Sequence, residues 1–253
     1  MKKKGMGKRA VRPEDEAKTF GEGLNFAAAE AYRLLRTNLL FALPYGALPE
    51  GENCRVVGVT SSLSGEGKST TSLNLGYMLA GSGRKVLLVE ADMRLPTISK
   101  RLGLDCKTGL SNLLAGLCGE QGVLQLSTIQ ENLWVMGAGE TPPNPSELLG
   151  SDRMKAVLKS ISPNFDFIIL DLPPVNEVAD ALVASRLTHG IIMVVRKDYA
   201  TRSSVEEAMR QLKHVNAKVL GFVMTHSEGQ GGKYKSGYTG EYGYAGAKKG
   251  SLK

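Results

Sequence analysis

The chain has 253 residues, of which 42% are hydrophobic and 23% charged, and its formal net charge is +7, so it can bury the core of one large α/β domain. No apolar run approaches the roughly 18 residues of a membrane-spanning helix, and the basic start lacks the apolar block of a secretory signal. We therefore expect neither segment and predict a cytoplasmic protein. The three cysteines have no metal-binding spacing and are expected to be reduced thiols.

The two ends of the chain carry much of the positive charge. MKKKGMGKR at the start holds five basic residues and no acidic one, and lysines recur after position 232. Such ends attract anionic lipid, nucleic acid or an acidic protein face, or they are solvated ends that aid solubility. We expect no nucleic-acid partner.

Helices and strands are predicted in alternation along the chain. Segment 27–43 has helix-forming residues and an apolar stripe, and Pro44 ends it. The expected strands are 55–62, 85–92, 132–139, 165–174, 190–198 and 218–225, and the expected helices between them are 68–81, 147–161, 178–187 and 202–215. Apolar strands joined by crossover helices indicate an α/β fold with one doubly wound, mostly parallel sheet.

A glycine-rich loop follows the first of these strands. In SSLSGEGKST, Gly65 and Gly67 precede Lys68 at a predicted helix start, where unpaired N–H groups and the helix dipole favour a phosphate. Lys68 is expected to reach the β- and γ-phosphates, and the Ser69 hydroxyl to bind Mg²⁺. The first glycine of the usual P-loop pattern is replaced by Ser62. The predicted nucleotide-binding residues of the loop are Ser64, Gly65, Glu66, Gly67, Lys68, Ser69 and Thr70.

Acidic residues stand at the ends of two further predicted strands. Glu90 and Asp92 end one of them and lie two apart, hence on the same face, and Asp171 ends the strongly apolar run FIILD. The carboxyl ends of parallel strands meet at the ligand crevice, so these acids are expected to face the triphosphate. Mg²⁺ would then offset their mutual repulsion.

The last part of the chain is rich in glycine, lysine and tyrosine. KYKSGYTGEYGYAGAKKG contains Tyr234, Tyr238, Tyr242 and Tyr244, half of the eight tyrosines in the chain. Composition alone favours a low-complexity interaction tail. The predicted nucleotide site upstream adds a second interpretation, in which the exposed phenols accept phosphate.

With these motifs together, the chain resembles the bacterial tyrosine kinases of capsule and exopolysaccharide synthesis. SSLSGEGKST resembles the Walker A motif, VLLVEADMR the Walker A′ motif and FIILDLPP the Walker B motif of that family, and the tyrosine cluster resembles the tail of its cytoplasmic members. The resemblance implies an ATP- and Mg²⁺-dependent protein-tyrosine kinase with a P-loop fold. The implied catalytic residues are Lys68, Glu90, Asp92 and Asp171, the metal ligands Ser69, Asp92 and Asp171, and the phosphate acceptors Tyr234, Tyr238, Tyr242 and Tyr244. Arg94 is expected to contact phosphate or hold the loop.

The resemblance also implies partners. Glu30, Arg33 and Arg36 in EAYRLLR match a family motif on a helix that docks onto a neighbouring subunit, although an intrahelical row of ion pairs would have the same spacing. The implied partners are further copies of the chain in a ring, a transmembrane activator that recruits it to the inner face of the membrane, and a cognate tyrosine phosphatase. We expect an extension with the oligomerisation helix at 1–44, a kinase domain at 45–228 and a flexible tail at 229–253.

The sequence departs from the family pattern at three positions, and two other functions are considered beside the kinase. Glu90 stands where the family has Asp, Ser64 replaces a common proline, and Thr225 stands where related ATPases carry an adenine-contacting Asn, so base recognition is not assigned. One rival is a ParA/MinD-type ATPase switch, which would have a second lysine in place of Leu63. The other is a non-catalytic nucleotide-binding scaffold of a polysaccharide assembly complex.

Overall fold

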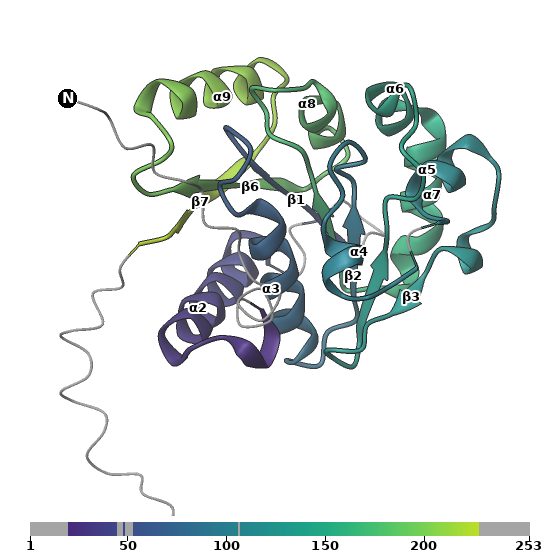
Figure 1. Cartoon of the computed structure of the whole chain (residues 1–253), viewed down its shortest axis with the longest axis horizontal. Helices are drawn as coiled ribbons and strands as arrows, with labels where there is room; N and C mark the ends of the chain where they lie inside the picture. Colours follow the sequence, from purple (N-terminus) through teal and green to yellow (C-terminus); the bar gives the residue numbers. More distant parts are fainter. Residues whose placement is uncertain (1–19, 45–47, 49–52, 106, 228–253) are drawn as a thin grey trace, which may run out of the picture.

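A seven-stranded sheet forms the centre of the computed structural model, which describes residues 20–44, 48, 53–105 and 107–227 (Figure 1). The strand order is β3-β4-β2-β5-β1-β6-β7, and within the described residues every neighbouring pair is parallel except β3 and β4. The strands are β1 (Arg55–Ser61), β2 (Val86–Glu90), β3 (Gln125–Leu126), β4 (Leu133–Met136), β5 (Phe167–Asp171), β6 (Gly190–Arg196) and β7 (Val219–Thr225).

Helices cover both faces of this sheet. The longer ones are α2 (Phe26–Ala42), α3 (Lys68–Ala80), α7 (Asp152–Ile161) and α9 (Arg202–His214), and the shorter ones are α4 (Ile98–Arg101), α5 (Leu110–Ala115), α6 (Pro145–Gly150) and α8 (Asp180–Ser185). Three short 3₁₀ turns at 21–23, 120–122 and 162–164 complete the described elements.

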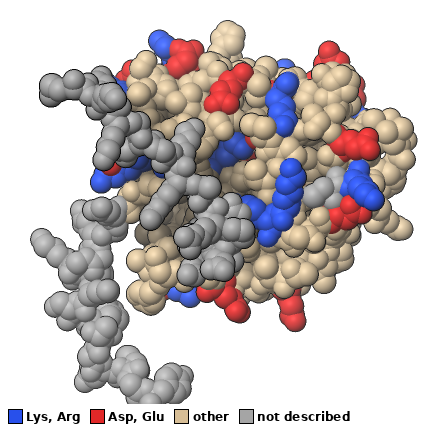
Figure 2. Space-filling model, in the orientation of Figure 1, with Lys and Arg blue, Asp and Glu red and all other residues tan. Residues whose placement is uncertain are grey.

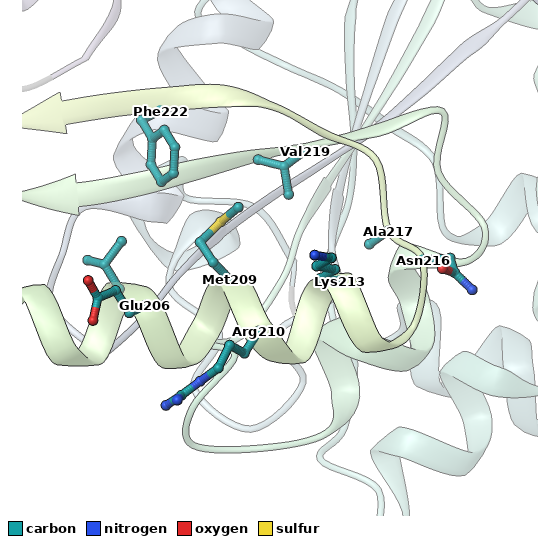
Figure 3. A pocket seen from close by; sticks show the side chains of 9 residues that line it. Glu206, Met209, Arg210, Lys213, Asn216, Ala217, Val219 and Phe222 are labelled. Carbon is teal, nitrogen blue, oxygen red and sulfur yellow. The ribbon is translucent and has the colours of Figure 1, made fainter.

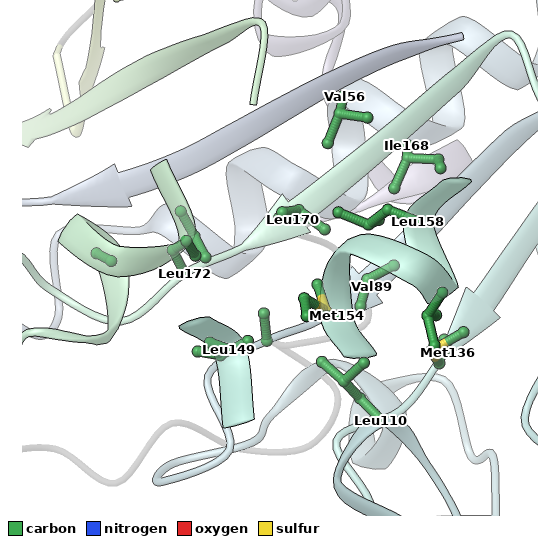
Figure 4. Packing of buried hydrophobic residues seen from close by; sticks show 14 of the residues in the cluster. Val56, Val89, Leu110, Met136, Leu149, Met154, Leu158, Ile168, Leu170 and Leu172 are labelled. Carbon is green, nitrogen blue, oxygen red and sulfur yellow. The ribbon is translucent and has the colours of Figure 1, made fainter. Parts of the chain in front are cut away.

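The alternation of side chains along each strand divides the core into two layers. In β5, Phe167 and Ile169 pack with α2, α3 and α4 on one face, whereas Ile168 and Leu170 pack with α5 to α9 on the other. Figure 4 shows the second layer, where Met154 of α7 lies near strand residues of the sheet. Burial on both faces is why these strands read as continuous apolar runs.

The doubly wound, mostly parallel sheet is confirmed, and the differences from expectation are local. The helix expected at 147–161 is two helices, because Ser151 adopts extended backbone angles and its hydroxyl accepts a hydrogen bond from the Met154 amide, which caps α7. Three elements, α4, α5 and β3, were not predicted from the sequence, and each has six residues or fewer. The division into 1–44, 45–228 and 229–253 stays a prediction.

Gly109 is required by the close approach of two backbone segments at the start of α5. A methyl group on Gly109 would lie 2.3 Å from the Gly137 carbonyl oxygen and 2.3 Å from the Gly139 nitrogen, whereas one on Gly119 would meet nothing within 4 Å. Gly109→Ala is therefore expected to lower the free energy of unfolding by about 1–3 kcal/mol in urea denaturation. The matched control, Gly119→Ala, should change it by less than about 0.5 kcal/mol. Equal values for the two variants would contradict this packing.

Candidate nucleotide site

The glycine-rich loop lies between the end of β1 and the start of α3. Gly65 and Gly67 have φ angles of 80° and 96°, in the left-handed region that favours glycine. Lys68 is the first residue of α3, and its first-turn amides face the loop. This strand–loop–helix arrangement is the one that the sequence predicted, and the binding of phosphate to it stays a prediction.

Residues from three other segments hold the loop in place. The buried Glu66 carboxylate accepts hydrogen bonds from the Leu63 amide at 2.7 Å and from the Arg196 amide at 3.1 Å. The Thr225 hydroxyl donates to the Glu66 carbonyl at 2.7 Å, and the Glu177 carboxylate accepts from the Ser64 amide at 2.6 Å. The Glu66 side chain thus supports the loop, which leaves its backbone amide for the predicted contact with nucleotide. Sequence reasoning missed the supporting residues, since β6, β7 and the segment before α8 are distant in the chain.

Lys68 lies between two buried carboxylates. Its Nζ is 2.7 Å from Asp92 Oδ2, and Lys68, Asp92 and Asp171 are 8%, 3% and 1% exposed. Burial by itself lowers the pKa of Lys68, but the charges of Asp171, Asp92 and Glu90 outweigh it and raise the pKa above its ordinary value. The ammonium therefore stays charged at neutral pH.

Asp171 at the end of β5 is only 1% exposed. Its Oδ1 accepts a hydrogen bond from the Ser72 hydroxyl at 2.9 Å, and its carboxylate also interacts with the Ser69 hydroxyl. Burial raises the pKa of Asp171, and Lys68 and the two hydroxyls only partly offset this. Ser69, Asp92 and Asp171, the three predicted metal ligands, thus all lie around Lys68.

Glu90 lies in the same region but its oxygens face α4. They accept hydrogen bonds from the Ile98 amide at 2.5 Å, from the Ser99 hydroxyl at 2.6 Å and from the Ser99 amide at 3.3 Å. Glu90 thereby supplies the side-chain cap that Thr97 does not provide to α4. Its predicted catalytic role stays untested, and the longer side chain accounts for its reach to α4.

Two other predicted nucleotide residues are held by protein partners. The Arg94 guanidinium binds both carboxylate oxygens of the buried Asp180, at 2.9 and 3.1 Å. Of the two roles expected for Arg94, this contact favours holding the loop. Arg101 Nη1 lies 2.9 Å from the Thr70 hydroxyl, and its guanidinium stacks over the Phe20 ring at 5.3 Å.

The predicted oligomerisation residues do not all share one face of α2. Arg33 pairs with Glu30 on the exposed side, whereas Arg36 Nη1 donates to the Met78 carbonyl of α3 at 3.2 Å. Arg36 thus helps to dock α2 onto α3. The four predicted acceptors, Tyr234, Tyr238, Tyr242 and Tyr244, lie outside the described residues.

A groove of about 860 Å³ lies elsewhere, between α9 and the edge strand β7. Figure 3 shows Met209 of α9 and Phe222 of β7 on its walls. No residue of the glycine-rich loop lines it, so we do not assign the nucleotide to it.

The described residues contain neither a preformed metal cluster nor a membrane-spanning helix, and their surface charges are mixed. In the face shown in Figure 2, acidic and basic side chains are interspersed rather than gathered by sign. Among the described residues, no helix is long and apolar enough to cross a membrane. The same residues contain no group of three or more His, Cys, Asp or Glu side chains arranged to hold a metal.

Comparison with known proteins identifies the family. A family model described as an AAA domain matches residues 54–221. The tyrosine-protein kinase YwqD of Bacillus subtilis (strain 168) is 34% identical over 220 residues, which cover 87% of each protein. The putative tyrosine-protein kinase CapB of Staphylococcus aureus is 34% identical over 197 residues, 78% of this chain and 83% of CapB. The chain belongs to the bacterial tyrosine kinases.

Solved structures of this kinase family have the same fold. The kinase domain of the Escherichia coli tyrosine kinase ETK matches with a TM-score of 0.71 at 32% identity, over 79% of this chain and 77% of that domain. The cell division ATPase MinD of Pyrococcus furiosus matches less well, with a TM-score of 0.57 at 27% identity over 67% and 71%. The chain is thus a protein-tyrosine kinase with a P-loop fold that is shared with a cell division ATPase.

The raised pKa of Asp171 predicts a pH-dependent stability difference. The native state keeps this proton to a higher pH than the unfolded chain, whose Asp pKa is about 3.9, so stability falls as pH rises through the folded pKa. Asp171→Asn removes this cost and keeps an oxygen for Ser72. Its gain in unfolding free energy over the wild type should therefore grow as the pH rises above the unfolded Asp pKa of about 3.9, and level off above the raised folded pKa, as measured by urea denaturation.

The control for this experiment is an exposed carboxylate. Asp152→Asn alters a side chain that is 98% exposed, and its stability difference from the wild type should stay constant over the same pH range. A constant difference for Asp171→Asn as well would contradict the assigned burial of its charge.

Proposed function

We propose that this kinase transfers the γ-phosphoryl group of ATP to tyrosines 234, 238, 242 and 244 of a neighbouring copy, and thereby regulates capsular or exopolysaccharide synthesis and export. The observation that carries the proposal is the buried Lys68–Asp92 pair beside Asp171 at the glycine-rich loop, in a chain 34% identical to tyrosine kinases. A buried ion pair with only a structural role would not require a glycine-rich loop at a helix start beside it.

Lys68 and the loop amides bind the phosphates in this proposal. The ammonium is already desolvated, and it has a raised pKa, so it brings a full positive charge to the triphosphate. On nucleotide binding Lys68 exchanges Asp92 for phosphate oxygens, which releases one carboxylate. Phosphoryl transfer requires mainly positioning and neutralisation of charge, and this exchange supplies both.

The donor set around Lys68 fits Mg²⁺. The Ser69 hydroxyl and the Asp92 and Asp171 carboxylates are hard oxygen ligands, and Mg²⁺ is usually held by one or two carboxylates together with substrate phosphates and water. Bound Mg²⁺ would neutralise charge on the phosphates. MinD of Pyrococcus horikoshii, 25% identical with a TM-score of 0.58, has been solved as a complex with Mg-ADP.

Asp92 is the carboxylate that orients the acceptor. A tyrosine hydroxyl has a pKa near 10 and needs an acceptor for its proton. Both Glu90 oxygens are engaged by α4, whereas Asp92 accepts from the Leu95 amide through Oδ1 and binds the Lys68 ammonium through Oδ2, the oxygen that would be freed when the phosphates take over Lys68. The phenolic oxygen then forms the bond to the γ-phosphorus, the bond from that phosphorus to the β–γ bridging oxygen breaks, ADP leaves, and the phenolic proton passes to Asp92.

The exposed face of α2 is the proposed contact with the neighbouring copy. Phe26, Leu34 and Phe41 are 80%, 61% and 80% exposed and flank the Glu30–Arg33 pair at helical spacing. Exposed apolar side chains gathered around a charged pair are typical of a protein interface. A ring of copies built through this face would bring one tail to the next site.

The remaining partners follow from the family resemblance. We propose a transmembrane activator that brings the kinase to the inner face of the membrane, and a tyrosine phosphatase that reverses the reaction. Each tail phosphate would add about −1.5 to −2 charge, so four of them would reverse the sign of the lysine-containing tail and loosen the ring.

Transfer between copies predicts the outcome of a mixing experiment. Lys68→Met alone should lose at least about 100-fold in tail phosphorylation, because the phosphates lose their cation. When Lys68→Met with an intact tail is mixed with a chain that has Lys68 but carries phenylalanine at 234, 238, 242 and 244, phosphotyrosine should appear on the Lys68→Met chain. Mass spectrometry of differently tagged chains measures this.

The control for the lysine is Lys155→Met on α7, an exposed position that should leave phosphorylation unchanged. Unchanged tail phosphorylation in Lys68→Met would contradict the proposed nucleotide site. A mixture without transfer, alongside an active wild type, would restrict the reaction to one chain. Phosphate release without any phosphotyrosine would instead favour the ATPase switch.

Reversing the exposed ion pair tests the role of α2. Glu30→Arg combined with Arg33→Glu keeps an oppositely charged pair on the helix but exchanges the positions of the positive and the negative charge at the proposed interface. Stability should change by less than about 0.5 kcal/mol, while the assembly measured by light scattering with Mg-ATP and the tail phosphorylation should both fall.

A matched swap uses another exposed pair. Arg202→Glu with Glu206→Arg reverses the pair on α9, whose side chains are 92% and 58% exposed, and should leave assembly and phosphorylation intact. If the α2 swap assembles like the wild type, the proposed interface is wrong.

A further inference from the structure

Tyr199 is an exposed aromatic residue that stands beside the glycine-rich loop. It lies in the connection between β6 and α9 and is 48% exposed. A methyl group built on Gly65 would lie 3.7 Å from the Tyr199 hydroxyl, so the phenol borders the loop itself. Neither the fold nor the phosphate chemistry described above gives it a role.

Arg196 and the local backbone hold the Tyr199 ring in position. The Arg196 guanidinium lies over one side of the ring, 5.0 Å from its centroid, and its Nη1 donates to the Gly65 carbonyl at 3.1 Å. The Arg196 amide donates to Glu66, and the amides of Tyr199 and Ala200 return to the Arg196 carbonyl in a tight turn. A planar ring held beside the loop, with half of its surface open, is a preformed stacking surface.

The order of the strands indicates which end of the nucleotide meets this ring. Asp171 ends β5 and Asp92 follows β2, both on one side of β1, and they mark the charged phosphate end of the site. Arg196 ends β6 and Thr225 ends β7, on the opposite side of β1. Phosphates that cross the loop toward Lys68 and the acids therefore leave the nucleoside on the β6–β7 side.

We propose that Tyr199 is the platform on which the adenine of ATP stacks, with Arg196 supporting the opposite side of the ring. This inference rests on the proposed binding of ATP phosphates at the glycine-rich loop. Stacking uses the π-face that every base has, so Tyr199 adds affinity and discriminates weakly between purines. The Thr225 hydroxyl is engaged with the Glu66 carbonyl, so it is not free to bind the base.

The experiment compares a ligand that has a base with one that lacks it. Calorimetric titration with Mg-ATP and with inorganic triphosphate is carried out on the whole chain. Tyr199→Ala should weaken ATP binding by about 10-fold, within a range of roughly 5- to 150-fold for loss of one aromatic–base stack, and should leave triphosphate binding unchanged. Tyr199→Phe and Tyr199→Trp, which keep a ring, should bind ATP within about 2-fold of the wild type.

The control variant removes an exposed aromatic ring elsewhere. Phe222→Ala truncates a side chain of β7 that is 56% exposed and lines the groove with α9, and it should bind both ligands like the wild type. If Tyr199→Ala binds ATP normally, or if Tyr199→Phe loses as much as Tyr199→Ala, stacking is overturned. Equal loss of ATP and triphosphate in Tyr199→Ala would assign Tyr199 to loop structure instead and overturn it too.

The failure of this inference differs from that of the proposed function. If the wild type binds neither ATP nor triphosphate, the phosphate site itself is wrong. If the wild type binds both and Tyr199→Ala changes neither, only the stacking platform is wrong.

Discussion

A buried ammonium between buried carboxylates is the constraint on which this site depends. Lys68 is charged, desolvated and 2.7 Å from Asp92, and Asp171 adds a second negative charge at the end of the adjacent strand. Taking such charges out of water is costly unless each has a partner. The strands β2, β5 and β1 are neighbours in the sheet, so their ends bring together Lys68, Asp92 and Asp171, which are distant in sequence. Each of these charges thereby gains its partner. Buried charges that are costly to desolvate are typical of a site that binds a charged ligand.

Around this cluster, other acids have supporting roles. Glu66 fastens the glycine-rich loop to β6, Glu90 caps α4, and Asp180 holds Arg94. Each is buried with its oxygens engaged by protein donors, so its charge is already compensated. Asp92 differs, since one of its oxygens is bound by the Lys68 ammonium, a cation that phosphates would attract. The kinase thus surrounds the Lys68–Asp92 pair with carboxylates held by backbone amides, by a hydroxyl and by Arg94, and these contacts would keep the backbone in place when the pair rearranges.

The core strands, the loop and the ends of β2 and β5 were predictable because they depend on local patterns. Apolar runs identify buried strands, and a glycine-rich stretch before a helix identifies a phosphate loop. The direction of individual side chains was not predictable. Glu90 and Asp92 share strand parity, yet one faces α4 and the other Lys68, since each follows the nearest donors in the folded chain. Tyr199 had no sequence signal at all, because its position beside Gly65 arises only when β6 lies next to β1.

The central claim is that Lys68 leaves Asp92 for the phosphates when nucleotide binds. The most direct measurement is a crystal structure of the whole kinase with Mg²⁺ and a non-hydrolysable ATP analogue. The account predicts that Lys68 Nζ contacts a phosphate oxygen, and that the Lys68–Asp92 pair of 2.7 Å is broken or shared with the phosphates. An analogue bound elsewhere, with the Lys68–Asp92 pair intact, would contradict it.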